Sequence, residues 1–148
     1  MHYCRKCPDA VAEIRGGVDA PQLSGCVQFY QENGCVLIVA RVSGLPERET
    51  SFFGFHIHYG ESCSGTGFSE TGSHYNPMDQ AHPRHVGDLP PLLAWQGNAY
   101  LSVKTDRFSV NDIIGRTVVI HSDPDDFQSQ PAGNAGNKIA CGEIRKRR

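Results

Sequence analysis

The stretch Val27-Gln-Phe-Tyr-Gln-Glu-Asn-Gly-Cys-Val-Leu-Ile-Val-Ala-Arg-Val42 decides the fold class. Its centre, Asn33-Gly34, is a strong signal for a tight turn between two strands. The residues on both sides are mostly β-branched, aromatic or aliphatic, as is typical of strands that are partly buried. We therefore predict a β-hairpin over residues 27–42.

The same alternation of short strands and turns continues along the chain. Strand-like runs occur at 98–103 and 116–121, and turn signals occur at Gly16-Gly17, Gly44-Leu-Pro46, Gly97-Asn98 and Gly115. Helical periodicity is hard to find. Regular short strands separated by turn residues predict an all-β sandwich or barrel.

Two stretches interrupt this pattern. Residues from Tyr59 to Leu93 are rich in Gly, Ser, Pro and His, and those from Ser122 to Asn137 are rich in Pro, Gly and Asn. Structureless loops of this length in a compact domain are usually functional or disordered. We expect a single domain over residues 1–148 with two long functional loops, an N-terminal arm (1–8) and a basic tail (145–148).

Composition narrows the class of protein. With 148 residues, 39% hydrophobic and 20% charged, the chain has an ordinary globular composition, and its net charge of −2 argues against binding to nucleic acid. No apolar run is long enough to span a membrane, and residues 1–10 lack the apolar stretch of a signal peptide. We therefore expect a cytoplasmic protein without membrane contact, or an exported one if a leader has been removed.

Histidines are concentrated in one part of the sequence. Of the seven, five fall between His56 and His85. If Phe55-His-Ile-His58 is a strand, the two imidazoles project from one face and the two apolar side chains from the other. The long loop adds four further candidate ligands, and a separate strand, 116–121, ends in a fifth. These are His74, His82, His85, Asp88 and His121.

Imidazoles with one carboxylate suit zinc or copper rather than magnesium or calcium. Seven candidate ligands exceed the four of a tetrahedral zinc ion, so they fit two sites if one histidine is shared or one site is irregular. A set of histidines that are individually hydrogen-bonded is the alternative, and their concentration argues against it.

With these histidines in this order, the chain resembles the copper/zinc superoxide dismutase family, from about Asp9 to Ile144. The matching segments, in the family's order, are Gly54-Phe-His-Ile-His58, Gly72-Ser-His-Tyr-Asn-Pro77, His85-Val-Gly-Asp88, Ile114-Gly-Arg-Thr-Val-Val-Ile-His121, Asp125-Asp126 and Gly133-Asn-Ala-Gly-Asn-Lys-Ile-Ala-Cys-Gly142. The resemblance implies a Greek-key β-sandwich or flattened barrel of about eight antiparallel strands.

The resemblance also implies the ligands. Copper would be bound by His56, His58, His74 and His121. Zinc would be bound by His74, His82, His85 and Asp88, with the ring of His74 shared as a bridging imidazolate. Asp125 would join His56 to His82 and fix the orientation of both rings; a loop-capping role is its alternative.

Six cysteines are present. The resemblance pairs Cys63 with Cys141 in a disulfide bond; two buried thiols are the alternative. Cys26 and Cys35 are expected to be small core or hairpin residues. Cys4-Arg-Lys-Cys7 could bind or deliver a metal or form a local disulfide, but a flexible arm fits its place near a terminus better.

Three features depart from the family. Only two residues separate His82 from His85, so the zinc loop is short. Lys138 stands where the family has an arginine that guides the substrate, which keeps the charge but loses the planar fork. Residues 127–137 carry no charge, so the steering charges of that loop are largely missing.

The resemblance implies an enzyme that disproportionates superoxide to dioxygen and hydrogen peroxide, with His74 and Lys138 as catalytic residues and copper and zinc as cofactors. The main alternative is a copper/zinc chaperone or storage protein on the same fold. A sandwich that has lost its activity is a third, but it would lack copper ligands. The sequence leaves the oligomeric state open, and a homodimer is one possibility.

Overall fold

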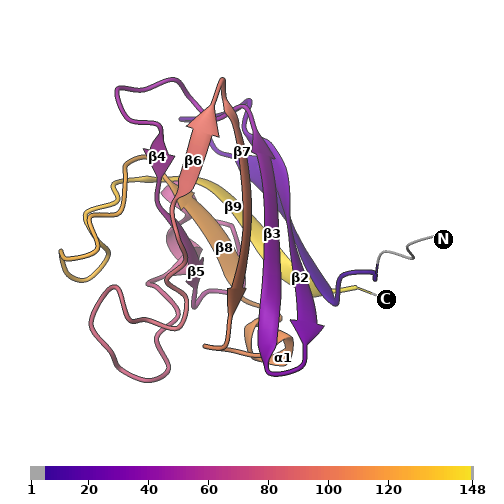
Figure 1. Cartoon of the computed structure of the whole chain (residues 1–148). Coiled ribbons are helices and arrows are strands. Elements are labelled where there is room, and N and C mark those ends of the chain that lie inside the picture. Colours follow the sequence, from indigo (N-terminus) through magenta and orange to yellow (C-terminus); the bar gives the residue numbers. More distant parts are fainter. Residues whose placement is uncertain (1–5, 148) are drawn as a thin grey trace.

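Nine antiparallel strands form one continuous sheet in residues 6–147, the part of the chain that this computed structural model describes (Figure 1). The strands are β1 (Ala10–Gly16), β2 (Ser24–Glu32), β3 (Cys35–Ser43), β4 (Phe52–Phe53), β5 (Phe55–His58), β6 (Leu92–Trp95), β7 (Asn98–Thr105), β8 (Thr117–His121) and β9 (Lys138–Lys146). Their order in the sheet is β4-β6-β7-β3-β2-β1-β9-β8-β5. The all-β prediction is confirmed, with one strand more than expected.

The predicted hairpin is β2 and β3. Their register pairs Glu32 with Cys35, so Asn33-Gly34 forms the two-residue turn. Gly34 has a φ of 79°, which a residue with a side chain rarely adopts. The local sequence therefore determines this turn.

The sheet closes on itself at Gly54. The two end strands of the order, β4 and β5, are consecutive in the chain and only this glycine separates them. The segment pairs with β6 through Phe52 and Phe53 and with β8 through residues 55–58. A sheet that closes in this way leaves few unpaired edges and encloses one core.

Every strand contributes side chains to the hydrophobic core. Strands β5 and β8 contribute core residues and also carry histidines. Phe55 and Ile57 on β5 and Val118 and Ile120 on β8 are fully buried in the core. The histidines of β5 alternate with these core residues, so burial of the apolar side chains fixes where the imidazoles lie.

Both long loops lie on the same side of the barrel, away from the chain termini (Figure 1). The first runs from residue 59 to 91 and contains the 3-10 segment Thr66–Thr71; β6 begins at Leu92, slightly earlier than predicted. The second fills residues 122–137 between β8 and β9. The predicted disulfide bond between Cys63 and Cys141 is present and ties the first loop to β9.

At the C-terminal end, part of the predicted basic tail is a strand. β9 continues to Lys146, so the first two residues of the basic run belong to a strand. Residues 1–5 and 148 lie outside the described part, so the Cys4-x-x-Cys7 prediction stays untested. The short helix α1 (Val110–Ile113) was not predicted, because one turn leaves no periodic pattern. Within residues 6–147 no helix is long and apolar enough to cross a membrane.

Candidate metal centre

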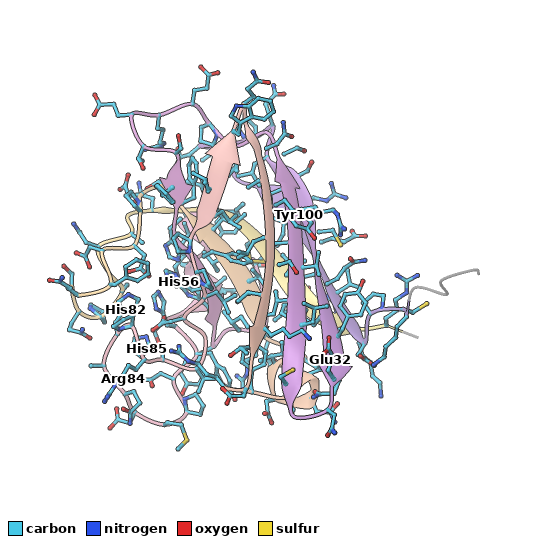
Figure 2. All side chains as sticks on the ribbon, viewed as in Figure 1. Glu32, His56, His82, Arg84, His85 and Tyr100 are labelled. Carbon is cyan, nitrogen blue, oxygen red and sulfur yellow. A yellow bond between two sulfur atoms is a disulfide. The ribbon has the colours of Figure 1, made fainter. Side chains whose placement is uncertain are left out.

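Six histidines and two aspartates gather where β5, β8 and the two loops meet. All six histidines are buried, and Figure 2 shows His56, His82 and His85 on the opposite side of the barrel from Glu32 and Tyr100. The side chains form three groups whose ligand atoms lie within 4.8 Å of one another. The first is His56, His58, His74 and His121, the second is His74, His82, His85 and Asp88, and the third is His56, His82 and Asp125.

In the first group, two strands and the first loop bring ring nitrogens together. His58 and His121 approach with their Nε2 atoms 3.2 Å apart. His58 Nδ1 lies 2.8 Å from the carbonyl oxygen of Gly72. Because Nδ1 must carry the proton to donate this hydrogen bond, Nε2 keeps its lone pair and can bind a metal.

In the second group, three Nδ1 atoms surround one carboxylate. Asp88 Oδ1 lies 2.8 Å from His74 Nδ1, and Oδ2 lies 3.1 Å from His82 Nδ1 and 3.2 Å from His85 Nδ1. Ligands about 2.0–2.1 Å from a tetrahedral zinc ion are roughly 3.3 Å from one another. The second group therefore has the dimensions of a zinc site, despite the short spacing of His82 and His85.

His74 belongs to both the first and the second group. Its Nδ1 lies among the second group, 3.3 Å from His85 Nδ1, and its ring stacks on His56 of the first group with the centroids 3.9 Å apart. Its Nε2 is buried and has no hydrogen-bond partner within residues 6–147. One ring thus offers one nitrogen to each group.

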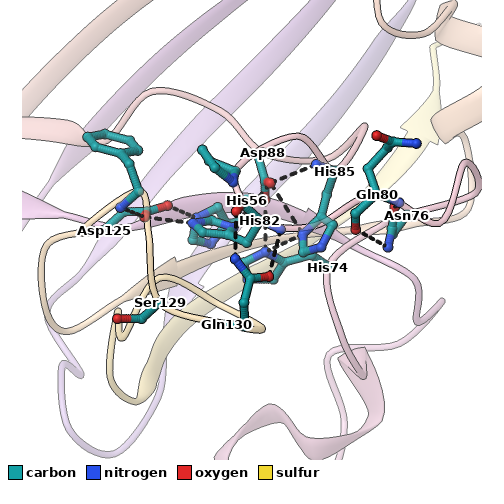
Figure 3. Close-up of polar contacts among 12 residues, drawn as sticks. His56, His74, Asn76, Gln80, His82, His85, Asp88, Asp125, Ser129 and Gln130 are labelled. Carbon is teal, nitrogen blue, oxygen red and sulfur yellow. Dashed lines mark hydrogen bonds and ion pairs between the residues drawn. The ribbon is translucent and has the colours of Figure 1, made fainter.

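Asp125, from the second loop, links His56 of the first group to His82 of the second (Figure 3). One carboxylate oxygen accepts a hydrogen bond from His56 Nε2 and the other from His82 Nε2, each at 2.7 Å. These contacts place the proton of both rings on Nε2, so that Nδ1 is free to bind a metal.

Unpartnered ring nitrogens show that the residues fit metal ions. In the described chain, buried nitrogens without a hydrogen bond include His56 Nδ1, His74 Nε2 and His82 Nδ1. A buried polar atom without a partner is costly, and bound cations would satisfy these atoms. The donor set of imidazoles with one carboxylate suits copper and zinc.

The pKa shifts favour the ligand forms of these groups. Burial lowers the pKa of His56, His58 and His85, and it lowers that of His121 to about 3. Neutral imidazole is the form that binds metals. Burial by itself would raise the pKa of Asp88, but in the metal-free chain a hydrogen bond from a proton on His74 Nδ1 and the nearby imidazoles hold it below its usual value. A zinc ion at this site would replace that proton.

A cavity of about 480 Å³ opens onto the first group. Its lining includes His58, His74 and His121, and its charged residues other than histidine are Lys138 and Asp79. Lys138 Nζ donates to Thr71 Oγ1 at 2.8 Å and to Gly72 O at 2.9 Å. An ammonium group has three N–H donors, so one remains for a ligand in the cavity. Burial lowers the pKa of Lys138.

Three residues near the centre were not predicted from the sequence. Asp79 lines the cavity. Gln130 contacts the backbone of His82, and Arg107 contacts the backbone of His85. No local pattern marks these residues, because each acts through contacts between segments that are far apart in the sequence.

Comparisons with known proteins agree with this geometry. The family model described as "Copper/zinc superoxide dismutase (SODC)" matches residues 23–144. The chain is 37% identical to "Superoxide dismutase [Cu-Zn] 3" of Arabidopsis thaliana, over 91% of this chain and 88% of that protein. It is 35% identical to "Superoxide dismutase [Cu-Zn] 2" of Aquifex aeolicus (strain VF5), over 84% and 80%.

A third relative is named as extracellular. "Extracellular superoxide dismutase [Cu-Zn]" of Brugia pahangi is 32% identical over 85% of this chain and 71% of that protein. The relatives therefore do not decide the compartment. Because the family model covers most of the chain and the relatives are matched over most of their length, the chain belongs to the copper/zinc superoxide dismutase family.

Proposed function

We propose that this chain is a superoxide dismutase that converts superoxide to dioxygen and hydrogen peroxide. Copper is assigned to His56, His58, His74 and His121, and zinc to His74, His82, His85 and Asp88. The observation that carries the proposal is the position of His74, whose two ring nitrogens belong to two different sets of ligands. Membership of the family supports the assignment.

Copper supplies two accessible oxidation states, which disproportionation needs, whereas zinc has no redox chemistry. His74 has a second task, because its Nε2 can hold the proton that the peroxide product takes up. The contact of Nδ1 with the zinc ligands keeps the ring in place while Nε2 changes its protonation state.

Lys138 is proposed to bind and orient superoxide. Its ammonium group lines the cavity beside His58 and His121 and is held by Thr71 and Gly72. A fixed cation at the opening raises the local concentration of a small anion. The remaining N–H can donate a hydrogen bond to the bound oxygen species.

An activity assay separates this function from copper storage or delivery. The copper- and zinc-loaded protein should consume superoxide far faster than the zinc-only protein, measured by stopped flow at equal protein concentration. His121→Ala, loaded under the same conditions, should lose most of this activity. A loaded protein that retains both metals but leaves the superoxide decay unchanged would contradict the proposal.

The oligomeric state and the location are also proposals. Four exposed apolar side chains lie on the outer face of β4, β6 and β7: Phe52, Leu93, Trp95 and Tyr100. Such a patch supports a homodimer, which sedimentation of the parent and of Trp95→Glu would test. The cytoplasmic location stays a prediction, and fractionation of the source cells would test it.

A further inference from the structure

The short zinc loop has few hydrogen bonds of its own. Within the segment from Ala81 to Asp88, Arg84 N donates to Ala81 O at 2.8 Å, Asp88 N to His85 O at 3.1 Å and His85 N to Asp88 Oδ2 at 2.9 Å. Near its end, the backbone of Gly87 bonds that of Tyr75 and Ile57. These bonds leave the backbone of His82 without a partner inside the loop. Because buried backbone groups need partners, the backbone of His82 depends on a residue from another segment.

Gln130 supplies the partners of His82. Its Oε1 accepts a hydrogen bond from the backbone N–H of His82 at 2.9 Å, and its Nε2 donates to the backbone oxygen of His82 at 2.7 Å (Figure 3). Its loop also carries Asp125, which holds the His82 ring. The second loop therefore fixes His82 at both its ring and its backbone.

Arg107 approaches the loop from the segment between β7 and α1. Its Nη1 lies 3.2 Å from the backbone oxygen of His85, 3.4 Å from that of Asp88 and 3.5 Å from that of Pro83. A single guanidinium nitrogen is thus shared among three carbonyl groups around the zinc ligands. Both Arg107 and Gln130 remain exposed to solvent overall, so their effect is expected to be moderate rather than large.

We propose that Gln130 and Arg107 are positioning residues for the zinc half of the centre. Neither contacts a metal: Gln130 fixes the backbone of His82, and Arg107 fixes the backbone of His85 and Asp88. The inference rests on the zinc assignment proposed above.

The experiment measures release of zinc from the metal-loaded, disulfide-intact protein to a chromogenic chelator. Gln130→Met keeps the length of the side chain and removes both hydrogen bonds. Arg107→Met removes the shared donor, and Arg107→Lys keeps a charged donor. We expect both Met variants to release zinc about tenfold faster, as for other residues that orient metal ligands, and Arg107→Lys to lie between parent and Arg107→Met.

Two variants are matched controls. Gln128→Met makes the same change two residues away, at a residue whose hydrogen bonds in the described structure involve only its backbone. Arg84→Met removes a charge from the zinc loop at a side chain that bonds only Gln80 in the described structure. Both should release zinc at nearly the parent rate.

Cobalt(II) in the zinc half gives a second readout, since its visible absorption reports ligand geometry. We expect Gln130→Met and Arg107→Met to change this spectrum while the unfolding temperature of the metal-free protein stays within the range of the controls. Zinc release at the control rate, or release that rises only in proportion to a lower unfolding temperature, would overturn the inference. A parent protein that takes up no zinc would overturn the proposed function on which it rests.

Discussion

Gly133 lies directly against the carboxylate of Asp125. A Cβ on residue 133 would overlap Asp125 Oδ1, the atom that accepts the hydrogen bond from His82. The glycine reaches this position through a turn of the second loop, in which Asp126 N donates to Gly133 O at 2.9 Å. Its φ of 69° is itself unfavourable for a residue with a side chain.

Gly133→Ala should therefore weaken the retention of metals. The left-handed backbone costs about 1–2 kcal/mol for alanine, and the overlap displaces Asp125 from His56 and His82. We expect both metals to dissociate at least tenfold faster, in the range known for ligand-orienting residues. Gly34→Ala is the control, since Gly34 has a similar φ of 79° and open space around it. Equal metal retention in the two variants would contradict this account.

The disulfide bond should stabilise the fold as well as the first loop. Cys63 and Cys141 are 78 residues apart, and closing a loop of this length destabilises the unfolded chain by roughly 4–5 kcal/mol in the chain-entropy model. The double variant Cys63→Ser, Cys141→Ser should lose about this much free energy of unfolding in denaturant, measured on metal-free protein. Cys35→Ser, at a half-exposed thiol outside the disulfide, is the control, and an equal stability of both variants would argue against the prediction.

Much of the fold could be predicted from local sequence. Asn33-Gly34 determines the β2–β3 turn, and the alternation in residues 55–58 orients two histidines away from the core. The closure of the sheet at Gly54 could not be predicted, because it depends on pairing with two strands that are far away in the sequence. The same holds for Gln130 and Arg107, whose roles arise only when separate loops meet.

Lys138 should give the reaction its pH dependence at alkaline pH. Burial lowers the pKa of this ammonium group, so it loses its charge at a lower pH than an exposed lysine does. The second-order rate constant should therefore fall as the pH rises through this lowered pKa. Lys138→Ala should be roughly tenfold slower at neutral pH, within the range of electrostatic focusing.

Lys138→Arg is the matched variant, because a guanidinium group stays charged over the whole range. Its rate constant should equal or exceed that of the parent, and the alkaline decline should be smaller. The measurement is the rate constant against pH at constant copper content. If the alanine and arginine variants have the same profile as the parent, Lys138 does not guide the substrate.

Asp79 should slow the encounter with superoxide. It lines the same cavity as Lys138, and its negative charge opposes an approaching anion. Asp79→Asn should therefore raise the rate constant several-fold at low ionic strength, and the gain should shrink as salt screens the charge. Asp106→Asn is the control, since it changes an exposed carboxylate that does not line the cavity, and it should have little effect. If both variants gain equally, the rate depends on the net charge of the protein and not on the position of Asp79.

If His74 is shared by a copper site and a zinc site, each chain should hold one ion of each metal, which can be measured as metal content per chain. Elemental analysis after loading and dialysis should find about one copper and one zinc in the parent. His121→Ala should lose copper and keep most of its zinc, and Asp88→Ala should lose zinc and keep most of its copper. Equal loss of both metals in both variants, or a parent that binds a single ion, would contradict the account.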